Sequence, residues 1–307
     1  IQDGLLKMKY IPENVCEITA NINAEFLKNA MENKVLICAK VLLYRPEEGL
    51  ILNLGGFRAI IPKDMAEYSQ TGHRIKEAAL ITKVNKKVCF YITDIKEENG
   101  QITVYCSRRD VQKQVFDEYI SNLKPGDVIP CTVTHIDSFG VFCDVAAGIT
   151  ALLPIDFIST SRIAAPSERF TVGQNIFACI KSIDENERIV LTHKELLGTW
   201  QENADLYTPF STATGIVRSI ENYGIFIELT PNLAGLAEVC EGVSPGDRVN
   251  VYIKSIIPDK MKIKLVILSK IPDSDFKSEI NYRINSGHIR KWKYSPDNAK
   301  KQIETVF

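Results

Sequence analysis

Residues 123–145 read LKPGDVIPCTVTHIDSFGVFCDV, and this stretch decides how the chain is interpreted. A Pro-Gly-Asp turn (125–127) precedes a run rich in apolar and β-branched residues, and a Phe-Gly-Val-Phe step (139–142) interrupts that run before it continues. Turn residues, β-branched residues and an internal glycine predict a strand, a bend and a second strand. Phe139 and Phe142 flank the bend. The stretch therefore predicts the core of a small β-barrel.

The same pattern returns later in the chain. VTHIDSFGVF (133–142) matches VRSIENYGIF (217–226) at an offset of 84 residues, and VGQNIFACIKSI (172–183) matches PGDRVNVYIKSI (245–256) at an offset of 73. Unequal offsets indicate an insertion in the first of these two units, around residues 159–168. A looser copy, EGLILNLGGFRAIIP (48–62), agrees only in its glycines and apolar alternation.

Strand-like runs separated by turns fill all three units. We therefore predict an all-β fold of three tandem, partly open, five-stranded OB-type barrels joined by short helices, with a small C-terminal β-hairpin extension. EAALITKV (77–84) is read as a strand of the first unit, and INYRI (280–284) with HIRKWKY (288–294) as the hairpin. The predicted segments are an N-terminal arm (1–31), a divergent first barrel (32–110), a helical linker (111–122), a second barrel (123–198), a helical linker (199–207), a third barrel (208–270) and a basic, aromatic extension (271–307).

The composition is ordinary for a soluble globular protein, with 45% hydrophobic residues and no apolar run near the roughly 18 residues of a membrane helix. Residues 1–10 lack a continuous apolar core, so no signal peptide is expected. Eight cysteines without a Cys-x-x-Cys pair predict buried reduced thiols rather than zinc ligands, as in a cytoplasmic protein. A net charge of −1 means that any nucleic-acid affinity must rely on stacking and local basic clusters.

Strand alternation separates core positions from candidate binding positions. In VFCDV (141–145), Val141 and Cys143 suit the core, so Phe142 is expected to face outward together with Asp144. Exposed aromatic rings stack bases of single-stranded nucleic acid whatever their sequence. A core position remains the alternative for Phe139 and Phe142. The recurrence of the pattern at Tyr223 and Phe226 favours a binding face.

These motifs resemble the S1-domain RNA-binding family. The resemblance rests on the Phe-Gly-x-Phe step, on ALLP (151–154), and on a late Asp184, Arg188 and LTHK (191–194). It implies binding of single-stranded messenger RNA in translation at the small ribosomal subunit. Carried over by position, it implies RNA contacts at Phe139, Phe142, Asp184, Arg188, Tyr223, Phe226, Lys260 and Lys262. We expect a monomer that needs no cofactor or metal and has no membrane partner.

The chain departs from the family pattern at two sets of positions. Pro62, Pro154 and Glu238 replace the family histidine in the three units. Glu48 and Ile51 stand at the aromatic positions of the first unit, so that unit is not expected to stack bases. The lost histidines and the near-neutral charge leave an adaptor that binds a protein partner as the alternative function.

Several of these residues also have an explanation that involves no RNA contact. Arg188 is otherwise a solvated turn residue, and Lys260, Lys262 and Lys264 are otherwise a charged strand edge. Residues 288–293 are either a second RNA-contacting patch or a segment that docks on the third unit. P-loop, nucleophile-elbow and His-Glu-x-x-His motifs are missing, so no enzyme is expected.

Overall fold

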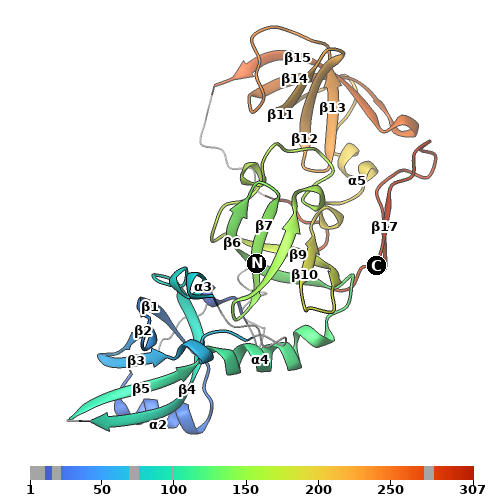
Figure 1. The fold of residues 1–307 in the computed structure, drawn as a ribbon. Coiled ribbons are helices and arrows are strands. Elements are labelled where there is room, and N and C mark those ends of the chain that lie inside the picture. The colour runs from blue at the N-terminus through green and yellow to red at the C-terminus, as the bar shows by residue number, and fades with distance from the viewer. Residues whose placement is uncertain (1–10, 16–21, 69–75, 99, 273–279) are drawn as a thin grey trace.

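The structure is a computed structural model that describes residues 11–15, 22–68, 76–98, 100–272 and 280–307. Three β-barrels follow one another along the chain, and β17 runs beside the second (Figure 1). Among the described residues, no helix has the length and apolar character needed to cross a membrane.

Each barrel has five strands. Barrel 1 consists of β1 (Ile37–Arg45), β2 (Gly49–Leu54), β3 (Phe57–Ile61), β4 (Lys87–Glu98) and β5 (Gln101–Ser107). Barrel 2 consists of β6 (Val128–Asp137), β7 (Gly140–Ala146), β8 (Ile149–Pro154), β9 (Asn175–Ile183) and β10 (Ile189–Thr192). Barrel 3 consists of β11 (Thr212–Glu221), β12 (Gly224–Thr230), β13 (Leu233–Ala237), β14 (Arg248–Ile257) and β15 (Lys262–Ile271).

Helices and short turns connect the strands and the barrels. The α-helices are α2 (Ala24–Glu32), α3 (Glu77–Ile81), α4 (Arg108–Glu118) and α5 (Trp200–Ala204). Single 3-10 turns are η1 (Glu13–Val15), η2 (Lys63–Met65), η3 (Ile120–Asn122), η4 (Ile155–Phe157), η5 (Pro166–Glu168), η6 (Lys194–Leu197) and η7 (Pro258–Lys260). Two short strands, β16 (Lys291–Lys293) and β17 (Glu304–Val306), end the chain.

The predicted fold of tandem five-stranded OB-type barrels is confirmed, and the barrels are closed where partly open ones were expected. In each one the first strand pairs antiparallel with the second and the fourth, and the third and fifth strands pair in parallel. That parallel pairing is only a few residues long, but it joins the two strands that would otherwise be edges. Closure satisfies their backbone N–H and C=O groups and removes the open edges.

Two local predictions were also wrong. Residues 77–81 form the helix α3 rather than a strand, because Glu, Ala and Leu are strong helix formers and the alternation is weak there. The C-terminal hairpin pairs Lys291–Lys293 with Glu304–Val306, whereas residues 280–284 form no strand.

In residues 141–145, burial follows the predicted alternation except at Asp144. Val141 and Cys143 are fully buried in the core of barrel 2, as predicted. Asp144 was expected to face solvent and is 3% exposed, because barrel 1 and the segment around Glu13 cover it.

Among the described cysteines, five are free and buried (Cys89, Cys106, Cys131, Cys143 and Cys179) and Cys240 is free and exposed. Cys38 is disulfide-bonded, so the prediction of reduced thiols was wrong for this residue.

A buried ionic cluster joins barrels 1 and 2. The Arg108 guanidinium, at the start of α4, donates to both carboxylate oxygens of Glu13 at 2.6 and 3.1 Å. The Glu13 N–H donates to the Asp144 carboxylate at 2.7 Å, and the Gly148 N–H donates to it at 3.0 Å. Three segments far apart in sequence therefore meet at one junction.

The insertion in barrel 2 and Arg169, directly after it, contact barrel 3. Arg169 donates from both terminal nitrogens to Glu228 of β12, each at 2.8 Å, and the pair is buried. Arg218 of β11 donates to the same carboxylate and to Glu168. The Ser161 N–H donates to the Pro231 carbonyl at 3.1 Å. The extra residues thus serve to hold the next barrel.

The C-terminal segment packs over the same junction. The Tyr294 hydroxyl donates to the Asn232 carbonyl at 2.7 Å, and the Trp200 N–H donates to the Tyr294 carbonyl. Trp292 and Tyr294 are buried, and His288 pairs with Asp127 of barrel 2 at 2.8 Å. Residues 288–294 therefore dock on barrels 2 and 3.

Candidate nucleic-acid interface

Barrel 2 carries an exposed aromatic pair at the turn between β6 and β7. Phe139 lies in the turn and is 51% exposed, and Phe142 lies on β7 and is half-buried. Their rings meet edge to face, with centroids 5.9 Å apart and planes at 90°. Gly140 between them permits the close approach of β8, since a Cβ there would lie 2.6 Å from the Leu153 carbonyl oxygen. The glycine thus lets the chain bend while the two rings face outward.

Barrel 3 repeats this geometry. Tyr223, in the turn before β12, is 70% exposed, and Phe226 on β12 is half-buried. The ring centroids are 6.1 Å apart and the planes meet at 89°. Gly224 again approaches a backbone carbonyl, that of Ala237, too closely for a side chain. The two predicted aromatic pairs therefore adopt the same arrangement in two barrels.

Strand register extends each pair into a row of outward side chains. In barrel 2 the row contains His135, Phe142, Leu152 and Val190, taken across β6, β7, β8 and β10. The His135 ring stacks on Phe142 with a centroid separation of 6.0 Å and an interplanar angle of 28°. His135 was not among the predicted site residues. Its cross-strand position opposite Phe142 was the signal that could have identified it.

The row of barrel 3 differs at its ends. It contains Ser219, Phe226, Leu236 and Lys264 in the same order of strands. A lysine thus takes the place of Val190, and a serine the place of His135. Aromatic character dominates the face of barrel 2, whereas positive charge enters that of barrel 3.

The predicted charged residues lie beside these rows. Arg188 is exposed and directly precedes β10, two positions before Val190. In barrel 3, Lys262 stands two positions before Lys264, so Lys262 is the counterpart of Arg188. Lys260 ends η7 and lies outside the strand, so of the two predicted lysines only Lys262 shares the strand register of Arg188.

Asp184 has a structural task in the turn between β9 and β10. Its carboxylate accepts the N–H groups of Asn186 at 2.9 Å and Arg188 at 2.7 Å. These bonds hold the backbone from which Arg188 projects. Asp184 therefore positions Arg188, and its contact with RNA stays a prediction.

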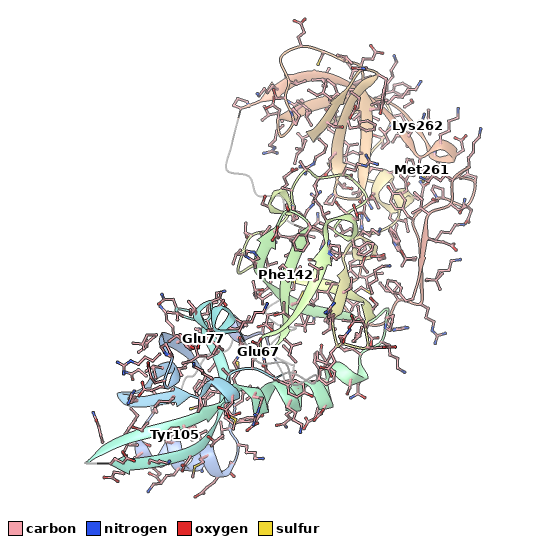
Figure 2. All side chains as sticks on the ribbon, in the orientation of Figure 1. Glu67, Glu77, Tyr105, Phe142, Met261 and Lys262 are labelled. Atoms are coloured by element: carbon pink, nitrogen blue, oxygen red, sulfur yellow. The ribbon has the colours of Figure 1, made fainter. Side chains whose placement is uncertain are left out.

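Barrel 1 keeps the glycine and lacks the aromatic pair. A Cβ on Gly49 would lie 2.2 Å from the Ile61 carbonyl oxygen, so the same close approach occurs. Glu48, at the first aromatic position, is bound instead by Arg45 at 3.2 Å and Arg58 at 2.5 Å. The corresponding row reads Leu43, Ile51, Ile60 and Tyr105 (Figure 2 labels Tyr105 on β5).

Comparison with known proteins agrees with this geometry. Residues 122–194, which are barrel 2, match the model of the S1 RNA binding domain. The chain resembles S1-domain proteins. Its barrels 1 and 3 lie outside the matched residues, so the repeated geometry is what relates barrel 3 to the S1 domain.

Curated relatives carry the name small ribosomal subunit protein bS1. That of Staphylococcus aureus (strain COL) is 28% identical over 272 residues, covering 81% of this chain and 66% of the relative. That of Rhodopseudomonas palustris is 29% identical over 248 residues, covering 79% of this chain and 42% of the relative. The chain thus spans less than two thirds of the length of these S1-domain relatives. A solved multidomain protein with nucleic acid binding domains from Streptococcus pneumoniae covers 76% of this chain and 73% of its own, at 13% identity and a TM-score of 0.26.

Proposed function

We propose that this chain binds single-stranded RNA on the aromatic faces of barrels 2 and 3, and that the RNA is messenger RNA in translation at the small ribosomal subunit. The single observation that carries the proposal is the repeated edge-to-face pair, Phe139 with Phe142 and Tyr223 with Phe226. The match of barrel 2 to the S1 RNA binding domain and the likeness to bS1 proteins support it.

The geometry suits stacking of unpaired bases. Phe139 and Tyr223 are the exposed members of the two pairs, and each partner ring buttresses its exposed neighbour from the side. A base that stacks on such a ring gains about 1–3 kcal/mol without sequence selection. Arg188 and Lys262 stand beside the rows, where a guanidinium or ammonium group can bind the backbone phosphates. Such contacts favour RNA binding over the alternative of an adaptor that binds a protein partner. We also place this RNA binding in the cytoplasm.

Titration of a single-stranded oligoribonucleotide tests the stacking contacts. We expect Phe139→Ala/Phe142→Ala to raise Kd by roughly 5- to 150-fold for each stacked base lost, and Tyr223→Ala/Phe226→Ala to act similarly. Ile81→Ala, on α3, removes an equally exposed apolar side chain away from both faces and should leave Kd unchanged. Equal affinities for wild type and both double variants would contradict the proposal.

A further inference from the structure

Charge is divided unevenly within barrel 3. The hairpin of β14, η7 and β15, residues 248–271, contains one acidic residue, Asp259, and six basic ones: Arg248, Lys254, Lys260, Lys262, Lys264 and Lys270. The rest of the barrel, residues 208–247, contains only Arg218 as a base and five acids: Glu221, Glu228, Glu238, Glu241 and Asp247. A protein with a net charge of −1 therefore holds one strongly positive hairpin.

The equivalent hairpins of the other barrels do not share this charge. Residues 175–192 of barrel 2 contain two basic and three acidic residues, and so do residues 87–107 of barrel 1. Lys181 of barrel 2 is the counterpart of Lys254 by the 73-residue offset, and its ammonium lies 4.6 Å from the centroid of the Phe157 ring. The Lys254 side chain, in contrast, is exposed. The positive hairpin is thus a property of barrel 3.

The register places the lysines next to the aromatic face. Lys264 is aligned with Leu236 of β13, which is itself aligned with Phe226. Two strand spacings, about 10 Å, therefore separate the backbones of Phe226 and Lys264. Lys254 occupies a bulge of β14 beside the pair of Ser255 with Lys264, and a bulge re-aims the side chain that it carries.

Protection of a strand edge does not explain these lysines. β15 pairs with β14 throughout Lys262–Leu265 and with β13 at Lys264 and Leu265, so this part of the strand is interior to the closed sheet. Lys262, Lys264 and Lys254 are exposed (Figure 2 labels Lys262 next to Met261). Lys270 differs, because its ammonium binds the Asp247 carboxylate at 2.8 Å.

We propose that the β14–β15 hairpin is a phosphate-binding surface for the RNA backbone, with Lys254, Lys262 and Lys264 as its contacts. The proposal rests on the proposed function and assigns different contributions to the RNA affinity to barrels 2 and 3. Barrel 2 binds chiefly by stacking, and barrel 3 adds the electrostatic part of the affinity. Tyr252 and Val266, which pair across β14 and β15 next to Lys264, add an apolar contact for the RNA at the end of the lysine row.

The salt dependence of binding separates these contributions. We would titrate a single-stranded oligoribonucleotide from 50 to 300 mM salt against wild type and Lys254→Ala/Lys262→Ala/Lys264→Ala. Three lost phosphate contacts should make the negative slope of log K against log salt shallower by about 2, with the largest loss of affinity at low salt. Lys28→Ala/Lys40→Ala/Lys86→Ala removes three exposed lysines, on α2, on β1 and just before β4, and it changes the net charge by the same amount. This control should keep the wild-type slope.

Other results would overturn the proposal. If wild type binds RNA and the hairpin variant keeps the wild-type slope, or the control loses as much, the hairpin is not the phosphate site and stacking alone survives. If wild type binds no RNA, the proposed function itself fails. A third test uses polyglutamate of the same charge as the RNA as a competitor. If polyglutamate displaces bound RNA as effectively as unlabelled RNA does, and if its own binding is weakened equally by the hairpin substitutions, the surface binds acidic protein instead.

Discussion

Asp144 and Glu228 lie 84 residues apart at equivalent positions of barrels 2 and 3, and both are buried against the preceding barrel. Burial and then the nearby charge of Glu13 raise the pKa of Asp144 to about 7, and backbone N–H donors only partly oppose this. Burial would also raise the pKa of Glu228, but hydrogen bonds from Arg169 and Arg218 hold it below its usual value. One carboxyl therefore titrates near neutrality while its counterpart stays ionised.

The raised pKa makes a pH-dependent prediction for Asp144. The folded state keeps a proton that the unfolded state releases near pH 4, so this group lowers the free energy of unfolding as the pH rises from about 4 to 7. Asp144→Asn cannot ionise, so the Tm of the variant minus that of wild type should increase between pH 5 and pH 8. Thermal unfolding followed by circular dichroism measures this difference.

Glu228→Gln is the matched control. The pKa of the wild-type Glu228 carboxyl is lowered, so this group is ionised in both the folded and the unfolded state over that range. The Tm difference between Glu228→Gln and wild type should therefore not vary from pH 5 to pH 8. A constant difference for Asp144→Asn as well would show that the carboxyl does not titrate there.

At the scale of elements, the turns between the second and third strands fit into the preceding barrels. The Ala147 carbonyl accepts a bond from Gln112 of α4, and Asn232 of barrel 3 donates to the carbonyls of Lys194 and Gly198. Tyr282 of the C-terminal segment reinforces barrel 2: its hydroxyl accepts from the Phe177 N–H at 3.2 Å and lies 3.0 Å from Nε2 of His193. Burial lowers the pKa of His193 to about 4, so the ring is neutral at pH 7. Its Nδ1–H then donates to the Ile158 carbonyl, and its Nε2 accepts a hydrogen bond from the Tyr282 hydroxyl.

Tyr282→Phe should therefore destabilise barrel 2. The change leaves the Phe177 N–H and His193 Nε2 without this hydroxyl, and unpaired buried polar groups cost about 1–3 kcal/mol. Urea unfolding should show a free energy of unfolding lower by that amount. Tyr223→Phe, at an exposed tyrosine, removes the same atom without loss, and equal stability of the two variants would contradict the assigned role.

The three barrels follow one another in a row (Figure 1). Buried ion pairs lie at the junctions between them. The junctions hold barrels 2 and 3 together, and both aromatic faces belong to one chain. An RNA long enough to contact both aromatic faces makes its second contact within the same complex. Its affinity therefore rises without any new kind of contact.

Oligonucleotide length tests this coupling. A strand of about 30 nucleotides should bind wild type at least about 100-fold more tightly than one of about 6 nucleotides, since one OB-type barrel contacts about 4–16. Phe139→Ala/Phe142→Ala should remove most of that gain while changing the affinity of the short strand less. A gain that persists in the variant would mean that the two faces do not share one strand.

Sequence reasoning reached the parts of the fold that depend on local pattern. The repeats located all three barrels, and the glycines at 49, 140 and 224 marked the bends because only glycine tolerates the adjacent carbonyl. The prediction failed at EAALITKV, where residues 77–81 form a helix rather than a strand. It also failed at Asp144, where alternation gave the correct side of the strand but neighbouring parts of the chain cover it.

The sequence by itself determined the repeated barrel, the two aromatic pairs and the absence of such a pair in barrel 1, because strand period and glycine sterics are properties of a few adjacent residues. Tertiary structure alone decided that the barrels close, that the insertion and the C-terminal segment join barrels 2 and 3, and that Lys264 shares a row with Phe226. These outcomes depend on which distant strands pair and which charged side chains meet on burial. Such long-range partners leave no trace in local spacing.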